Sequence, residues 1–292
     1  MIVISFITVL LSIVSPALGL IYFIPSGGKI FIENPKIRKY VFPQILILIF
    51  SAIYFKVISL PEGIDVVLTY SISLPIFFYF LIKKMDYGKS LEIFGGLTTI
   101  FISLKFFLLK NYIIQNWETS IENISKLMEK MNITAEQKEI SQQLIVSSKY
   151  VFIHYTVAIT TVSLILALYI GSLVLNKKII IKWNYSKHSF SFEIVYLLII
   201  AILCSLFSIS HYIGINLLII LGSFFLIQGL AILNYYWGGF MRRSKVFTFF
   251  FILTLILNPY VLLLIALVGL MDMWFDIRKI REVEESNEDN PN

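Results

Sequence analysis

The sequence predicts an all-α fold: a polytopic transmembrane bundle of about eight to ten membrane helices with one helical hairpin outside the membrane. Apolar residues make up 58% of the 292-residue chain and charged residues only 14%, and the mean hydropathy is +0.84. A water-soluble domain of this length could not bury so much apolar surface. The composition therefore excludes a soluble enzyme, a disordered chain and a disulfide-stabilised scaffold, and it makes the lipid bilayer the expected partner.

Apolar runs without charges locate the membrane helices, because a helix that crosses the bilayer needs roughly 20 such residues. The runs cover residues 40–54, 66–82, 91–109, 150–175, 194–209, 214–234 and 246–270. The chain then divides into N-terminal membrane helices (1–110), an external amphipathic segment (111–149), C-terminal membrane helices (150–281) and a disordered acidic tail (282–292).

Two elements each allow two readings. Residues 1–33 form either one long helix or two short helices broken at Ser15-Pro16, because proline lacks the N–H donor and disfavours helical geometry in the residue before it. Asn258-Pro259 interrupts the last run near its middle. There we favour a hairpin that returns the C-terminus to the inner side over a single kinked span.

Four clusters of lysine and arginine determine the expected orientation. They fall in alternate connections: Lys36, Arg38 and Lys39; Lys83, Lys84 and Lys89; Lys177, Lys178, Lys182 and Lys187; and Arg242, Arg243 and Lys245. Cytoplasmic loops are enriched in basic residues, so we expect these loops in the cytoplasm of a bacterial cell and the protein in the inner membrane. This role accounts for the net charge of +6 without a nucleic-acid partner.

The external segment has the pattern of a helical hairpin. Its apolar residues recur at spacings of three and four: Ile114, Trp117, Ile121, Ile124, Met128 and Met131. This spacing indicates an amphipathic helix, and Thr134 with Gln137 fits a capping box that begins a second helix. The hairpin could cap a binding cavity or dock a partner protein. We favour the simpler reading, in which it lies on the membrane surface or covers other loops.

Polar residues at membrane depth are candidates for ligand binding, because they are costly there. His154, Tyr155 and His211 lie near the outward ends of their helices and are candidates for the lining of an outward-facing pocket. Interfacial anchoring is the more ordinary role of such side chains. Lys56 and Lys105 lie about one turn from helix ends, where snorkelling of the ammonium group to water explains them.

One apolar run carries the remaining ligand-binding candidates, Asn216 and Gln228. Gly214, Gly222 and Gly229 in the same run share a face and allow a neighbouring helix to approach closely. Gln228 lies deep in the span near this face, and it is the best candidate for a polar contact in the bundle core. An amide in hydrocarbon needs a partner, so we favour helix packing over ligand contact for Gln228.

Signatures of catalysis are missing from the sequence. It contains no HExxH, no GxSxG and no glycine-rich phosphate-binding motif, and its three histidines and one cysteine make no credible metal cluster. We therefore expect no enzyme activity, no catalytic residue, no metal and no cofactor. Any use of ATP would require a separate protein.

The end of the last apolar run carries Asp272, Trp274, Asp276 and Arg278. The two aspartates can share a helix face, whereas Arg278 forms no helical i, i+4 pair with either of them. One reading is a cytoplasmic docking or gating element in which Arg278 reaches a carboxylate of a partner or a lipid phosphate. The other is that these groups mark where the helix leaves the membrane, with Trp274 as the interfacial anchor.

Several segments resemble the YybS-like family of predicted bacterial membrane proteins, which is a domain of unknown function. They are Gly214-Ile-Asn-Leu-Leu, Phe225-Leu-Ile-Gln-Gly-Leu-Ala-Ile, Gly269-Leu-Met-Asp-Met-Trp-Phe-Asp-Ile-Arg-Lys279 and Met128-Glu-Lys-Met-Asn-Ile-Thr-Ala-Glu-Gln137. More distantly, the family is similar to the substrate-binding membrane components of energy-coupling-factor vitamin transporters. That similarity implies six helices around a cavity that is roofed by outward loops.

Together these patterns favour a membrane protein that binds or transports a small molecule as a substrate-capture component, with a separate energy-coupling partner. The alternative is a non-transporting membrane scaffold that recruits proteins through its external hairpin or its acidic tail. An outward-opening cavity among the first six helices, lined by residues such as His154 and Tyr155, would favour the first function. Solid packing there, with an exposed apolar stripe on the hairpin, would favour the second.

Overall fold

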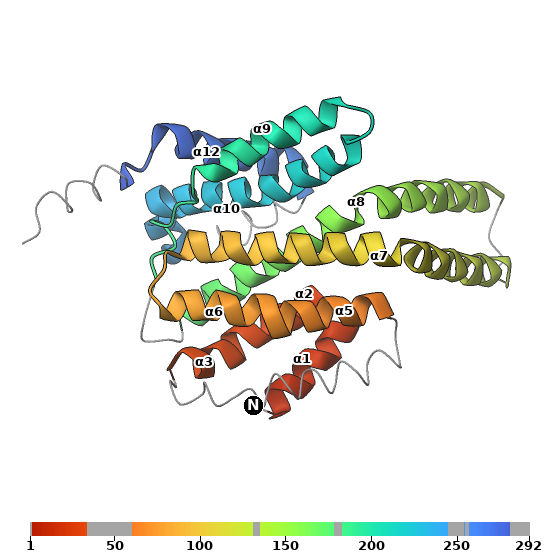
Figure 1. Cartoon of the computed structure of the whole chain (residues 1–292), viewed down its shortest axis with the longest axis horizontal. Helices are drawn as coiled ribbons and strands as arrows, with labels where there is room; N and C mark the ends of the chain where they lie inside the picture. The colour runs from red at the N-terminus through yellow and green to blue at the C-terminus, as the bar shows by residue number, and fades with distance from the viewer. Residues whose placement is uncertain are drawn as a thin grey trace, which may run out of the picture.

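The computed structural model describes residues 2–33, 60–130, 135–177, 183–244, 254 and 257–280. Its helices are α1 (Ile2–Val14), α2 (Pro16–Phe23), η1 (Ile24–Gly28), α3 (Lys29–Glu33), α5 (Leu60–Leu68), η3 (Thr69–Ser73), α6 (Leu74–Ile82), α7 (Tyr87–Lys130), α8 (Ala135–Asn176), α9 (Glu193–Leu206), α10 (His211–Arg243) and α12 (Pro259–Phe275). The elements η1 and η3 are π-helical turns within longer helices. These ranges contain no strand, so the predicted all-α bundle is confirmed (Figure 1).

Several of these helices have the length and composition of membrane spans. Four described segments are long and apolar enough to cross a bilayer: Gly63–Ile82, Tyr87–Met128, Glu139–Asn176 and His211–Gly238. The helices α9 and α12 are apolar but shorter. The predicted span 40–54, the basic residues 36–39 and the acidic tail 282–292 lie outside the described residues. The total of about eight to ten spans therefore stays a prediction.

The N-terminal region follows the two-helix reading. Ser15 separates α1 from α2 with an extended backbone (φ −163°, ψ 132°), and Pro16 occupies the first turn of α2, where its missing N–H costs no helical hydrogen bond. The Tyr70 hydroxyl donates to the Pro16 carbonyl over 3.0 Å and lies 3.3 Å from the Ser12 hydroxyl. The helix break is thus favoured by Pro16 and also held by the contacts of Tyr70 in η3.

Helix α8 occupies the centre of the bundle, where it packs against α2, α7 and α10 (Figure 1). The core around it is aromatic and aliphatic. Phe77, Phe94 and Leu168 are fully buried, and the two phenylalanine rings meet edge to face at 6.2 Å. This apolar packing needs no polar side chains, so polar groups inside the bundle require another reason to be there.

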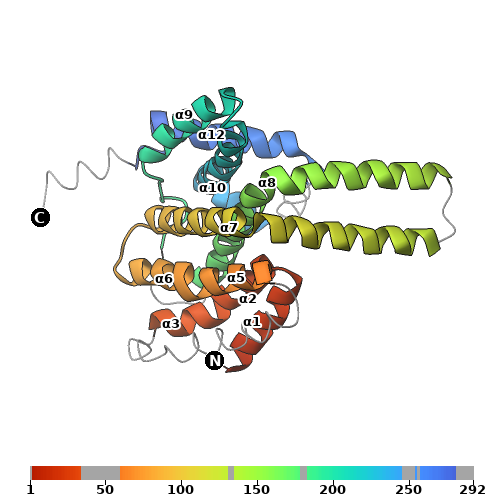
Figure 2. The same ribbon diagram turned by 45° about the vertical axis from the view of Figure 1, so that its right-hand side comes forward.

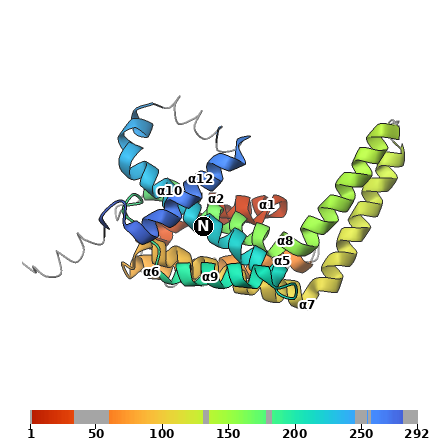
Figure 3. The ribbon, with the colours of Figure 1, turned by 90° about the horizontal axis from the view of Figure 1, so that it is seen from above.

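The external segment continues two membrane helices instead of forming separate ones. The C-terminal part of α7 and the N-terminal part of α8 run side by side and project from the bundle as two arms (Figures 2 and 3). Trp117 stacks on Phe152 at 5.9 Å, and Lys149 pairs with Glu118 over 2.7 Å. The arms stand away from the bundle, which contradicts the expectation that this hairpin covers other loops; the turn that contains Thr134 lies outside the described residues.

The loops that follow α6 and α8 meet at one end of the bundle. The Glu92 carboxylate accepts hydrogen bonds from the backbone N–H of Ser191 and, over 2.7 Å, from its hydroxyl. The Tyr87 ring stacks on Trp183 at 6.0 Å. We call this the basic end; it carries Lys83, Lys84, Lys89, Lys177 and Lys187.

Helices α10 and α12 cross at backbone contact. A Cβ atom at Gly229 would lie 2.0 Å from the carbonyl oxygen of Ile265, and one at Gly269 would lie 1.9 Å from that of Phe225. Only glycine permits this approach. The predicted glycine face is therefore confirmed at Gly229, whereas Gly222 has no neighbour within 4 Å of such an atom.

The break at Asn258-Pro259 begins α12. The Asn258 side chain accepts a hydrogen bond from the Tyr260 N–H over 3.0 Å, and Pro259 fills the first helical position, which is a favourable helix start. The path of residues 245–253 lies outside the described residues, so the hairpin reading of this region stays a prediction.

Candidate functional site

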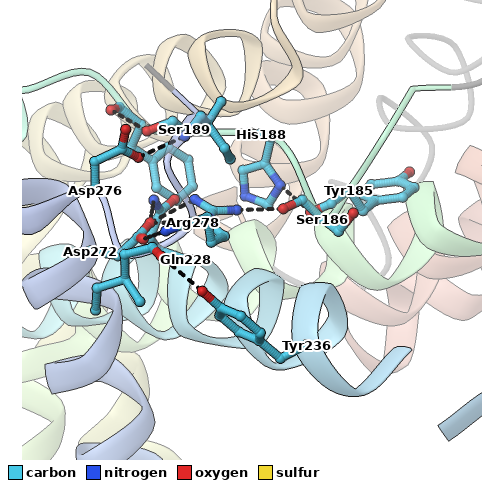
Figure 4. A network of polar contacts seen from close by, with 12 residues as sticks. Tyr185, Ser186, His188, Ser189, Gln228, Tyr236, Asp272, Asp276 and Arg278 are labelled. Carbon is cyan, nitrogen blue, oxygen red and sulfur yellow. Dashed lines mark hydrogen bonds and ion pairs between the residues drawn. The ribbon is translucent and has the colours of Figure 1, made fainter. Parts of the chain in front are cut away.

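Three groups of polar residues stand out in this apolar bundle, and the first is an ion pair at the end of α12. The helix ends at Phe275 because Asp276 adopts a left-handed conformation (φ 41°). This turn brings Arg278 back beside Asp272, so that Nη2 and Nε of Arg278 lie 2.7 and 3.1 Å from Oδ2 of the aspartate (Figure 4). The Arg278 backbone N–H also donates to Asp272 Oδ1 over 3.3 Å.

The ion pair joins three parts of the chain. Gln228 of α10 is fully buried and donates from Nε2 to Asp272 Oδ2 over 2.8 Å. Nη1 of Arg278 donates to the Ser186 carbonyl of the loop before α9 over 2.6 Å. Gln228 thus makes the polar contact in the bundle core that the sequence indicated, with α12 as its partner, while its binding of a ligand stays a prediction.

The structure corrects the docking interpretation of Arg278. Its side chain is 1% exposed and that of Asp272 is 2% exposed, so the guanidinium cannot reach a carboxylate of another protein or a lipid phosphate without breaking this pair. Asp276 acts locally, because its carboxylate accepts the Ile280 N–H over 3.1 Å. Trp274 is 51% exposed, in keeping with the role of an interfacial anchor.

His188 lies beside this network and was not singled out by any sequence pattern. Its Nδ1 atom lies 2.7 Å from the Tyr185 carbonyl oxygen, and its ring is buried. Burial lowers the pKa of His188 from its usual 6.5 to about 4, and the nearby Arg278 charge acts in the same direction against the Tyr185 hydrogen bond. At neutral pH this histidine is therefore uncharged, and its ring meets those of Tyr87 and Phe190 edge to face.

The second group lines a cavity of about 660 Å³ between α7, α8 and α10, which we call the aromatic cavity. Its walls are mostly apolar, with Phe106, Phe107, Ile153, Val157, Ile213, Leu217 and Ile220. Its polar lining consists of Thr99, Ser103, Lys110, His154, Tyr212 and Asn216. Two of its walls come from the first six predicted helices, but the third, α10, does not.

The aromatic cavity brings together only part of the predicted site. His154 and Asn216 line it, whereas Tyr155 and His211 do not. The His211 Nδ1 atom lies 2.6 Å from the Ser205 carbonyl oxygen and belongs to the turn between α9 and α10. The Tyr155 ring lies 6.4 Å from that of Tyr212.

Asn216 holds the wall of this cavity in place. Its Nδ2 atom donates to the His154 carbonyl over 2.6 Å and to the Tyr212 carbonyl over 2.7 Å. Its Oδ1 atom accepts the Ala158 N–H over 2.9 Å. The amide therefore engages a carbonyl and an N–H one helical turn apart on α8, and the His154 ring stacks on Tyr212 at 3.8 Å. Asn216 therefore positions the His154 and Tyr212 rings in the wall of the cavity.

The third group lines a cavity of about 600 Å³ on a neighbouring face of α7 and α8, toward α5, which we call the polar cavity. Lys105 of α7 pairs there with Asp65 of α5 over 2.5 Å, and their side chains are only 8% and 7% exposed. The snorkelling interpretation of Lys105 is therefore wrong. Sequence reasoning missed the pair because its members lie on different helices, and no spacing rule connects them.

Among the described residues, no group of three or more histidine, cysteine, aspartate or glutamate side chains is arranged to hold a metal ion. Comparison with known protein families supports the membrane character of the chain. No curated protein and no solved structure matches the chain. The family described as "Predicted membrane protein (DUF2232)" matches residues 3–273. This range includes both cavities and the Gln228–Asp272 contact, and the chain belongs to the DUF2232 family of predicted membrane proteins.

Proposed function

We propose that this protein binds a small, mostly apolar molecule in the aromatic cavity and acts as a substrate-capture or transport component of the bacterial inner membrane. The observation that carries the proposal is the cavity itself. Its volume of about 660 Å³ falls in the usual range for small-molecule sites, which are mainly apolar with a few convergent polar groups.

The polar groups of the aromatic cavity suggest how such a ligand is oriented. The ring nitrogens of His154 and the Ser103 hydroxyl make no side-chain hydrogen bond to a described residue. The ammonium group of Lys110 lies at the exposed rim. A ligand with an apolar body and one polar or anionic end would pack against Phe106 and Leu217 and direct its polar end to His154 and Lys110.

The position of the aromatic cavity suggests the side from which it is filled. His154 precedes Asn176, at the basic end, by 22 residues of continuous helix α8, which is a distance of about 33 Å. The cavity and the basic end thus lie at opposite ends of the bundle. With the basic loops in the cytoplasm, the cavity opens toward the outer face. The proposed likeness to energy-coupling-factor components would add a separate protein that supplies energy.

Filling the aromatic cavity is expected to remove the bound molecule. Native mass spectrometry of protein purified in nanodiscs should detect a small molecule on the wild type and at least about tenfold less of it on Val157→Trp, because the indole takes the space of the ligand. The matched control is Ile159→Trp, on the same helix at a side chain that is 52% exposed. Equal occupancy of Val157→Trp and wild type would contradict the site.

The orientation of the chain makes a separate prediction. In a Cys204→Ser background, a membrane-impermeant maleimide should label Ser141→Cys on the arms in intact spheroplasts, because the arms face outward. It should label Lys84→Cys at the basic end only after the membrane is permeabilised. The reverse labelling pattern would place the basic loops outside and would invert the proposed direction of capture.

The scaffold alternative has its own supporting observation. The arms carry exposed apolar side chains, with Leu127 60%, Leu144 65% and Val146 70% exposed, and such patches mark contacts with proteins or membranes. If no small molecule is found on the wild type, and Leu127→Glu abolishes a specific in-cell crosslink from the arms, recruitment of a partner protein becomes the better function.

A further inference from the structure

The polar cavity differs from the aromatic cavity in its chemistry. Most of its lining residues, among them Asp65, Lys105, Asn116, Thr156 and Thr160, have a side chain that can form hydrogen bonds. The cavity lies where the two arms leave the bundle, because its lining runs from Lys105 into the arm of α7.

The ion pair in this wall joins α5 to α7. Lys105 and Asp65 are almost fully buried, and a buried ion pair is often no more stable than well-packed apolar side chains of the same size. Ionisable groups at membrane depth instead mark ligand or ion pathways. The Lys105–Asp65 pair therefore calls for a ligand that needs both charges.

Neutral hydrogen-bonding groups surround the pair. Thr156 and Thr160 of α8 and Asn116 of α7 line the cavity, and their side chains make no hydrogen bond to a described residue. All three residues are half-buried, so a polar ligand in the cavity can form hydrogen bonds with them in addition to the contacts it makes with the two charges.

The balance of charge restricts the class of ligand. A ligand with an ammonium group and an anionic group can separate the pair, with its ammonium group on Asp65 and its anionic group on Lys105, so that every buried charge keeps a partner. A ligand with a single net charge would leave one of the two buried charges uncompensated, which is unfavourable. The polar cavity therefore favours ligands with one positive and one negative group over simple cations or anions.

We propose that the polar cavity is a second binding site, specific for a zwitterion that carries an ammonium group and a carboxylate or phosphate a few ångströms apart. Two sources offer this chemistry at the membrane surface: a free amino acid and the headgroup of phosphatidylethanolamine. The aromatic cavity is not required for this site, because the two lie on different faces of α7 and α8.

The variants that test this site are designed to disturb the bundle as little as the exchange of charges allows. Asp65→Asn with Lys105→Met removes both charges together, a change that is often neutral or stabilising for a buried pair. The exposed pair Glu118 and Lys149, whose side chains are 49% and 44% exposed, provides the matched control as Glu118→Gln with Lys149→Met. The charge swap Asp65→Lys with Lys105→Asp keeps both charges in the cavity with their positions exchanged.

Binding is measured on the full chain with two probes. Radiolabelled L-serine is added to protein in nanodiscs of phosphatidylglycerol alone, and native mass spectrometry counts phosphatidylethanolamine retained from mixed nanodiscs. We expect wild type and the Glu118/Lys149 control to bind one probe, and the double neutral variant to bind it at least about tenfold more weakly. The charge swap should recover part of this loss. Binding of serine assigns a free zwitterion, and retention of lipid assigns the headgroup.

Two results would overturn the proposal: wild type that binds neither probe, or a double neutral variant that binds as tightly as wild type. The occupancy of the aromatic cavity, measured in the same spectra, should stay unchanged in every one of these variants. If only the occupancy of the aromatic cavity falls, the result counts against the proposed function and not against the polar cavity.

Discussion

Alanine at Gly269 is expected to separate α10 from α12 and to destabilise the protein by about 1–3 kcal/mol, because overpacking at a fixed contact is costly. The added Cβ atom would lie 1.9 Å from the carbonyl oxygen of Phe225. The atom it meets belongs to the backbone, so no side-chain rotation relieves the clash. Gly229→Ala should act in the same way, since its Cβ atom would lie 2.0 Å from the carbonyl oxygen of Ile265.

Helix α10, which carries Gly229, also provides the control for this experiment. Gly222→Ala adds a methyl group on α10 where nothing lies within 4 Å, and alanine has the higher helix propensity, so its stability should equal or exceed that of wild type. The measurement is the midpoint of thermal unfolding in detergent, followed by size-exclusion chromatography. A Gly269→Ala protein that melts with wild type would show that the two backbones do not touch.

Removal of one partner of the Asp272–Arg278 pair is the second large effect. Asp272→Ala leaves the guanidinium group, whose side chain is 1% exposed, without its counter-charge, and it also removes the acceptor of Gln228. Loss of one partner of a buried pair costs about 3–5 kcal/mol. We expect Asp272→Ala to lower the unfolding midpoint strongly and to free the loop that contains Ser186.

A double-mutant cycle distinguishes this pair from general damage to α12. Arg278→Met in the Asp272→Ala background removes the uncompensated charge, so the double variant should be more stable than Asp272→Ala alone. The exposed Glu118→Ala serves as the control and should cost less than about 1 kcal/mol. If the effects of the two substitutions on the free energy of unfolding simply add, Asp272 and Arg278 do not stabilise the fold as an ion pair.

Much of the architecture follows from local patterns in the chain. Composition and apolar runs predicted an all-α membrane bundle, and the proline in Ser15-Pro16 marked a real helix boundary. Gly229 and Gln228 were recognised as packing residues, because small or amide side chains in an apolar helix have few other uses. These features depend on neighbours within one or two helical turns, which a sequence displays directly.

The functional groups depended more on tertiary structure. Arg278 was placed out of reach of Asp272 because a helix was assumed to continue, whereas Asp276, with no glycine to signal it, turns the chain back. His154 and Asn216 line one cavity, but Tyr155 and His211, equally polar and at the same depth, do not. Depth in the membrane can be read from a run of residues, but the direction of a side chain depends on the rotation of its helix against its neighbours.

The sequence by itself determined that this chain enters the membrane, that proline marks helix boundaries at Ser15-Pro16 and Asn258-Pro259, and which loops are basic, because hydrophobicity, proline geometry and charge act along the chain. Only the tertiary structure decided that Asp65 of α5 meets Lys105 of α7, that Gln228 meets Asp272, and that two cavities flank α7 and α8. These contacts join residues at least 40 positions apart, and their energy depends on distance and burial in space, which no local pattern records.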